Sequence, residues 1–287
     1  MFLTVASVSP ASAEPFFFST GDPDGLMATA SRPGAGGAFE IETADDFVLT
    51  GATTLNSATF TGLVPGGSSV QSVAVEIYRV FPNDSDIGRT SGSPTFSTSQ
   101  VPTRVNSPSD VALDSRDSAG GTLTFVTGVL SNSFTANNSV QPGGIHPKPG
   151  QTTLGDGPVT GEEVEFSVTF TTSFMLGPDH YFFVPQVQLD NGDFLWLSAP
   201  RPIVSPGTPF PAGSTDLQSW TRDAMLDPDW LRVGTDIVGG APAPTFNAAF
   251  SLSGTTAAIP EPASLMMFGA GLLGLGLRRR RARAKPR

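Results

Sequence analysis

The sequence predicts an all-β protein: an antiparallel β-sandwich or jelly roll with one short helix in its body and a transmembrane helix near its C-terminus. Three features of the 287 residues favour this fold. Apolar residues make up 38% of the chain, which is enough for a buried core. Gly (32) and Pro (26) are abundant, as in turn-rich β structure. Several segments alternate apolar and polar residues with period two, which is typical of strands.

The clearest strand is expected at Glu163–Phe174. Its apolar positions, which begin at Val164, alternate with Glu, Ser and Thr over the whole segment. One face of this strand must be buried and the other wet, as in an antiparallel sheet that is packed on one side. Seven further strands are expected: Asp46–Leu49, Leu55–Leu63, Val70–Phe81, Thr122–Leu130, His180–Leu189, Phe194–Ser198 and Phe246–Leu252.

A β-hairpin is expected where the sequence reads LDNGDF, from Leu189 to Phe194. The central Asn-Gly pair favours a type I′ turn, in which both central residues need positive φ. This turn would pair Leu189 with Phe194. Two residues further from the turn it would pair Val187 with Trp196, on the same face, so the turn and the apolar pattern predict the same register.

One short helix is expected to start at Thr215. The residues from Thr215 to Gln218 have the form of a capping box, and an apolar stripe that includes Trp220 and Met225 follows. Asp227 and the proline after it would end this helix. Segments rich in Pro and Gly are expected as long loops within one body: Arg32–Ala38, Gln141–Pro158 and Pro200–Gly213.

Charge is distributed unevenly along the chain, whose formal net charge is -10. Seven of the 16 basic residues lie in the last ten positions, so the chain before them carries 9 basic and 26 acidic residues, a net of -17. This excess of negative charge argues against a nucleic-acid partner. The absence of cysteine excludes disulfides, thiolate metal sites and thiol nucleophiles.

The first 13 residues resemble a signal peptide. An apolar run ends in Ala11-Ser12-Ala13, a small-x-small pattern that signal peptidase recognises, so cleavage would expose Glu14. The run is short and has no basic residues at its start. Either the true start lies upstream of Met1 or the pattern arose by chance. We expect an exported protein with its signal peptide at residues 1–13.

The other end of the chain has three consecutive parts. Pro260-Glu261-Pro262 is followed by an uncharged apolar segment, 263–277, and then by a basic tail, 278–287, that starts with Arg278, Arg279, Arg280 and Arg281. As a helix the apolar segment would span about 22 Å, less than the roughly 30 Å of a bilayer core. The arginines would act as a stop-transfer signal and hold that end in the cytoplasm.

This tail, residues 258–287, resembles the PEP-CTERM sorting signal of Gram-negative bacteria. The resemblance implies recognition by an intramembrane exosortase, transient residence in the inner membrane, removal of the tail near Pro260-Glu261-Pro262, and delivery to the cell surface or the extracellular matrix. The body, residues 14–256, also resembles uncharacterised PEP-CTERM proteins, for example in DHYFFVPQV (Asp179–Val187). That similarity implies no activity.

The motifs of nucleotide-binding proteins, zinc proteases and serine hydrolases do not occur in the sequence, so we expect no enzyme and no cofactor. Glu163 and Glu165 have a spacing that overlaps that of glycosidase carboxylates. Charged residues are expected on the wet face of a strand in any case, so solvation is favoured over catalysis. Acidic turns offer oxygen ligands to calcium, or cap their own backbone. The four candidate calcium ligands are Asp84, Asp86, Asp190 and Asp193.

Most of the Trp and Tyr side chains are expected in the core, since they occupy alternating or striped positions. If exposed, they would form a platform for sugar rings. We therefore expect a structural or adhesive protein of the cell surface, the exopolysaccharide matrix or a biofilm. Two alternatives stay open: a carbohydrate-binding β-sandwich module with exopolysaccharide as its ligand, and a secreted polysaccharide hydrolase with two carboxyl groups of raised pKa in a cleft.

Overall fold

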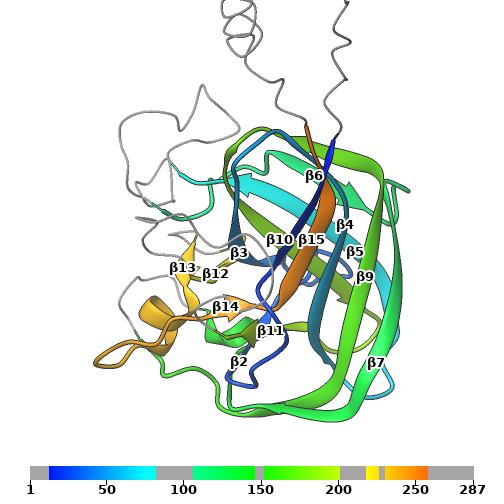
Figure 1. Ribbon diagram of the computed structural model, residues 1–287. Helices are drawn as coiled ribbons and strands as arrows, with labels where there is room; N and C mark the ends of the chain where they lie inside the picture. The colour runs from blue at the N-terminus through cyan, green and yellow to red at the C-terminus, as the bar shows by residue number, and fades with distance from the viewer. Residues whose placement is uncertain (1–12, 82–105, 146–151, 201–217, 226–229, 258–287) are drawn as a thin grey trace, which may run out of the picture. The chain divides into compact units, whose positions relative to one another are not determined.

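The computed structural model describes residues 13–81, 106–145, 152–200, 218–225 and 230–257, which form two β-sheets that share one core (Figure 1). The elements are β1 (Glu14–Ser19), β2 (Met27–Ala30), β3 (Ile41–Leu49), β4 (Thr53–Val64), β5 (Val70–Arg79), β6 (Asp114–Asp117), β7 (Leu123–Ala136), β8 (Asn138–Val140), η1 (Pro142–Gly144), β9 (Val159–Leu176), β10 (Asp179–Leu189), β11 (Leu195–Ala199), β12 (Trp220–Asp223), β13 (Leu231–Arg232), η2 (Val233–Val238), β14 (Asn247–Ala248) and β15 (Phe250–Thr256). The two η segments are a 3-10 turn and a π-helical turn.

The larger sheet has nine strands, in the order β1-β15-β4-β11-β2-β8. On the other side of β4 lies β9, and β7 pairs with β9 at the edge, while β14 extends β11. The smaller sheet has six strands, in the order β13-β12-β3-β10-β5-β6. Most pairs are antiparallel, and the β2–β8 pair is parallel. The all-β sandwich that the sequence predicts is therefore confirmed.

The core lies between the two sheets and is rich in phenylalanine. Phe60 of β4 stacks on Phe166 of β9, with ring centroids 4.9 Å apart, inside the larger sheet. Phe183 of β10 stacks on Phe250 of β15, at 5.1 Å, across the two sheets. Such aromatic pairs contribute about 0.5–1.5 kcal/mol each beyond the area they bury. Phenylalanine contacts therefore hold the two sheets together.

All eight predicted strands occur. In β9 the side chains from Val164 to Phe170 alternate between buried and exposed positions, as period two requires. β3 begins at Ile41, earlier than expected. The prediction missed its first half because that part contains acidic residues, which are nevertheless buried in the structure. Six strands had not been predicted, namely β1, β2, β6, β8, β12 and β13, and five of them have four residues or fewer.

The hairpin expected at 189–194 is wrong. β10 and β11 lie in different sheets, so Leu189 and Phe194 are not cross-strand partners. Gly192 does have positive φ (76°), but Asn191 is not among the residues with positive φ, so the turn is not type I′. Instead, the turn binds the loop after β4: Ser69 N donates to Asp190 Oδ1 at 2.8 Å. The apolar residues on both sides face one core from opposite sheets, which gives the same sequence pattern as a hairpin.

The helix expected from Thr215 is also wrong where the structure describes it. Trp220–Asp223 is the strand β12, which pairs with β3 and places Trp220 opposite Ala44 and Arg222 opposite Glu42. Residues 215–217 lie outside the described part of the chain. Long-range pairing with β3, including an ion pair between Arg222 and Glu42, outweighs the local preference for a helix.

Both ends of the body lie in neighbouring strands, since β1 and β15 are hydrogen-bonded to each other (Figure 1). Residues Pro15–Thr256 form one compact unit. β15 stays paired with β4 up to its last residue, where Thr256 lies opposite Thr53. The folded body therefore ends at Thr256, two positions before residue 258.

Candidate functional site

The outer face of the smaller sheet carries a buried polar cluster, formed by Glu42 of β3, Glu76 and Tyr78 of β5, and Arg222 of β12. We call it the Glu42–Glu76 cluster. It lies on the side of the sheet that faces away from the main core, because the inward positions of β5 are taken by valines and Ile77. Glu42 is 1% exposed and Tyr78 is 2% exposed.

The four side chains are joined by hydrogen bonds. The hydroxyl of Tyr78 donates to Glu42 Oε1 at 2.6 Å, and it lies 3.0 Å from Glu76 Oε2. Arg222 donates from Nε to Glu42 Oε2 and from Nη2 to the Tyr78 hydroxyl, the latter at 2.9 Å. Both carboxyl groups therefore share the Tyr78 hydroxyl as a hydrogen-bonding partner.

Aromatic rings cover the guanidinium group of Arg222. Its Cζ lies 4.7 Å from the ring centre of Trp230 and 5.4 Å from that of Tyr78. The indole of Trp230 donates to the carbonyl of Ser109 at 3.1 Å, which fixes its position. Cation–π contacts of this kind stabilise an arginine most strongly where water is excluded.

The two carboxyl groups of the cluster have opposite pKa shifts. Burial alone would raise the pKa of Glu42, but the charge of Arg222 and the hydrogen bonds of the cluster together lower it below 4.5. Burial and the negative charge of Glu42 raise the pKa of Glu76 to about 8. Burial and the same charge raise the pKa of Tyr78 above its ordinary value. At neutral pH Glu42 is therefore ionised, whereas Glu76 keeps its proton.

A polar row links this cluster to a surface cavity. On β10, Gln186 donates to Glu40 Oε1 at 2.9 Å, and two residues further Gln188 accepts from Ser72 Oγ, also at 2.9 Å. Gln188 lines the cavity, whose volume is about 340 Å³. Polar side chains therefore continue along the outer face from the buried cluster to open solvent, beside the buried apolar residues Phe182 and Val184.

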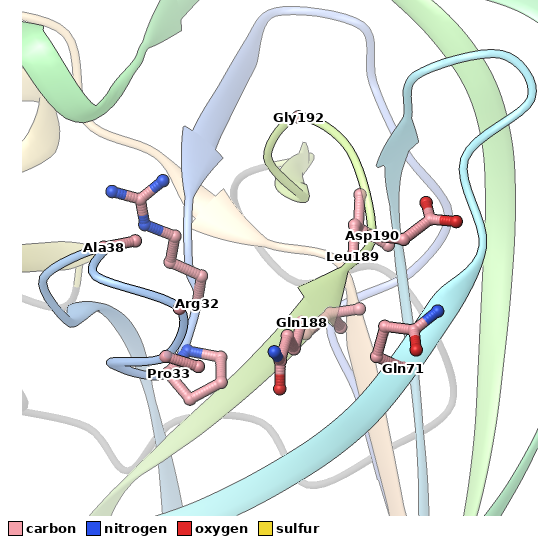
Figure 2. Close-up of a pocket in the computed structure, with 11 residues that line it drawn as sticks. Arg32, Pro33, Ala38, Gln71, Gln188, Leu189, Asp190 and Gly192 are labelled. Carbon is pink, nitrogen blue, oxygen red and sulfur yellow. The ribbon is translucent and has the colours of Figure 1, made fainter.

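Figure 2 shows the cavity between two walls. The loop that bears Arg32, Pro33 and Ala38 forms one wall, and Gln71 and Asp190 lie on the other. Amide, guanidinium and carboxylate groups are thus close to one another. They can form hydrogen bonds with the hydroxyl groups of a ligand, but none of them is an activated nucleophile.

Two of the predicted calcium ligands are described, and both have protein partners. Asp190 accepts from the backbone of Ser69, and Asp193 forms an ion pair with Arg32. Asp84 and Asp86 lie outside the described residues. Within the described ranges, His, Asp and Glu side chains form no group of three or more that could hold a metal ion. Calcium binding stays a prediction.

The aromatic side chains that could have formed a sugar platform are buried, as the sequence favoured. Their exposed fractions are 3% or less in each case: Trp196, Trp220, Trp230, Tyr78 and Tyr181.

Glu163 and Glu165 lie on the partly exposed face of β9, as expected. Burial, together with the charge of Asp22, raises the pKa of Glu163.

Sequence reasoning did not find the Glu42–Glu76 cluster. Its carboxyl groups come from β3 and β5, and its cation comes from β12, which is 180 residues from Glu42 in the sequence. One signal was available: Glu76 and Tyr78 occupy the polar positions of the predicted strand Val70–Phe81. Nothing local shows that these positions are buried.

The residues predicted to direct sorting, Pro260, Glu261, Pro262 and Arg278 to Arg281, lie outside the described part of the chain. Among the residues that are described, no helix is long and apolar enough to cross a membrane. The predicted signal peptide and the apolar segment 263–277 are thus not tested by the structure.

Comparison with protein families finds the PEP-CTERM protein-sorting motif at residues 258–281. The match includes Pro260-Glu261-Pro262, the apolar segment and the first arginines. No curated protein matches the chain. No solved structure matches it either. The motif starts one residue after the described body ends, at Ala257. The chain therefore carries a PEP-CTERM protein-sorting motif after a β-sandwich body, and this motif supports exosortase-dependent sorting and export.

Proposed function

We propose that this protein is a structural or adhesive component of the cell surface or of the exopolysaccharide matrix, and that it is not an enzyme. The observation that carries this proposal is the sorting motif at 258–281, directly after the last strand of a folded β-sandwich. In this proposal exosortase removes the tail near Pro260-Glu261-Pro262, after the apolar segment has held the chain in the inner membrane.

The Glu42–Glu76 cluster supports a structural role for the smaller sheet. Its carboxyl groups, phenol and guanidinium bond to one another, and Trp230 covers the cation. A buried ion cluster of this kind stabilises one packing arrangement of the strands that provide its members. Here it joins β12 to β3 and β5.

The experiment that tests sorting replaces Pro260-Glu261-Pro262 with alanines in a host that has the matching exosortase. Proline keeps this segment out of the helix and accessible, whereas alanines would let the apolar helix extend over it. We expect the variant to stay in the inner membrane at full length, as shown by immunoblots of membrane and surface fractions. The control replaces residues 285–287 (Lys-Pro-Arg) with alanines, which lie outside the matched motif. Equal processing of the first variant and wild type would refute the assignment of the motif.

The cavity of Figure 2 favours a second function, carbohydrate binding. Its amide and carboxylate groups suit a hydroxyl-rich ligand. We expect saturable binding to the exopolysaccharide of the producing organism, weakened by Gln71→Ala together with Gln188→Ala. A control pair on the exposed face of β9, Thr169→Ala with Thr171→Ala, should bind as wild type does. Binding that does not saturate, or that both pairs change equally, would leave the structural role alone.

The third alternative, a polysaccharide hydrolase, has one supporting observation. Glu42 and Glu76 have pKa values shifted apart, as in acid–base pairs. Two features favour a structural explanation instead: only Glu76 has the raised pKa that a cleft pair was expected to show, and Glu42 is buried beneath its partners. Loss of polysaccharide cleavage in Glu76→Gln, in protein that binds and folds normally, would establish the enzyme.

A further inference from the structure

β7 is the outermost strand of the larger sheet, and within the described residues it pairs with β9 alone (Figure 1). Apolar side chains near its middle are exposed to solvent: 69% for Val126, 56% for Val129 and 57% for Leu130. Both faces of β7 are open here, because exposed positions follow one another without alternation from 126 to 130. Such an edge presents apolar side chains and backbone hydrogen-bonding groups together.

The sequence of this edge contains none of the residues that usually protect an edge strand. From Ser118 to Ile145 there is no charged residue, and the first proline after Ser118 is Pro142. Edge strands of natural proteins ordinarily carry lysine, proline or inward-pointing charges, which oppose pairing with another chain. The β7 edge is thus chemically suited to accept a further strand.

The regular part of the edge runs from Leu123 to Val129. Over these seven residues β7 keeps one register with β9, and the first irregularity comes between Val129 and Ser131. A flat strand of this length extends over about 23 Å, which is enough for ordinary strand pairing. The residues are of the types that favour strands, with one glycine, Gly128. The later irregularities limit pairing to this stretch.

Charge identifies the occupant. The protein is strongly acidic, with a net charge of -10, so two copies repel each other over most of their surfaces. The uncharged β7 edge is where two copies can approach without that cost. A partner of opposite charge would be attracted to the acidic surface and not to this strand. A strand that meets a copy of itself in antiparallel orientation needs only a two-fold axis, the commonest symmetry of protein dimers.

We propose that β7 is a self-association edge: two copies of this chain pair antiparallel along Leu123–Val129 and continue the larger sheet across the dimer. This inference goes beyond the proposed function and does not depend on it, because it concerns the purified protein. It provides a means for a surface protein to connect to its neighbours.

The absence of cysteine makes a direct test possible, because a single introduced cysteine can form a disulfide only between two copies. The full chain in mild detergent receives one cysteine at Val126, the centre of Leu123–Val129, which lies opposite its own copy when two such strands pair antiparallel. The control is Thr169→Cys, on the exposed face of β9 and directly opposite Thr124. Cross-linking is followed under a mild oxidant by non-reducing electrophoresis. The apolar tail affects all variants alike, so their relative rates report on β7.

We expect Val126→Cys to cross-link at least ten times faster than Thr169→Cys, since antiparallel strands that pair about position 126 bring its two Cα atoms to the separation that disulfides need. Adding Thr127→Glu to Val126→Cys should slow it at least tenfold, because two carboxylates would lie diagonally across the pairing edge. Met175→Glu, at a side chain that is 83% exposed on β9, should leave the rate unchanged. Rates equal to that of Thr169→Cys, or an equal effect of both glutamates, would overturn the proposal.

Discussion

Two regions of this molecule place side chains against the usual rule, in opposite directions. On the outer face of the smaller sheet, the charged carboxylate of Glu42 is buried, and the side chain of its partner Arg222 is only 13% exposed. At the edge of the larger sheet, β7 exposes valines and a leucine over a stretch that has no charge at all. A buried charge persists only where partners compensate its desolvation, and an exposed apolar edge persists where it has something to bind. The first region accordingly holds the body together, whereas the second suits contact with another molecule.

The largest expected effect separates buried from exposed ion pairs. Arg222→Met keeps the aliphatic stem but leaves the buried carboxylate of Glu42 without its cation, so we expect the free energy of unfolding to fall by about 3–5 kcal/mol. Arg32→Met removes a partly exposed pair with Asp193 and should cost about 1 kcal/mol or less. Urea unfolding followed by circular dichroism measures both. Equal losses would mean that the Glu42–Glu76 cluster does not stabilise the sheet.

The next effect appears when the pH is changed. The pKa of Glu76 is raised from 4.5 to about 8 in the folded protein. Its proton therefore stabilises the fold fully below pH 4.5, and this contribution is lost as the pH rises toward about 8. Glu76→Gln cannot lose a proton, so we expect it to melt higher than wild type at pH 9 and at about the same temperature at pH 4.5.

The same titration contains its own control. The lowered pKa of Glu42 stabilises the fold above pH 4.5, and that contribution is lost as the pH falls further. Glu76→Gln should therefore lose stability at acid pH as wild type does. At alkaline pH it should not show the loss of stability that wild type shows. Melting curves of wild type and variant from pH 3 to 9 would refute the raised pKa of Glu76 if their alkaline limbs coincide.

The smallest effect compares glycines in the two regions. Gly192, beside the polar cavity, has φ of 76°, and a Cβ there would lie 2.8 Å from Pro65 Cγ. Gly192→Val should cost about 1–3 kcal/mol through backbone strain. A Cβ at Gly128 of β7 meets nothing within 4 Å, and its φ is not in the left-handed region. Gly128→Val should therefore be neutral or slightly stabilising in chemical unfolding. A large loss at Gly128 would show that the β7 edge is packed and not open.

Local pattern was a good guide to the strands and a poor guide to their neighbours. The alternation in β9 predicts both its extent and its buried face, because period two is a property of the strand itself. The apolar residues around Gly192 predicted a hairpin, but β10 and β11 face each other from different sheets. Alternation predicts which side of a strand is buried, but it does not predict which strand lies beside it.

The buried acids of β3 show the same limit for the candidate site. Glu42, Asp45 and Asp46 are each exposed by 1% or less, although acidic residues are ordinarily placed in water. Their partners are distant in sequence: Arg222 for Glu42, the backbone of Ala248 for Asp45 and His180 for Asp46. No local signal predicts such compensation.

The sequence by itself determined the β class, the main strands, the uncharged stretch from Ser118 to Ile145 and the sorting motif, because each of these is a contiguous pattern of residue types. Only the tertiary structure decided that Trp220–Asp223 is a strand, that Glu42 meets Glu76 and Arg222, and that the uncharged stretch lies at an open edge. The physical reason is range. Periodicity and motifs act between near neighbours in the chain, whereas strand pairing and charge compensation join residues up to about 200 positions apart, as in the bond from Ala248 to Asp45.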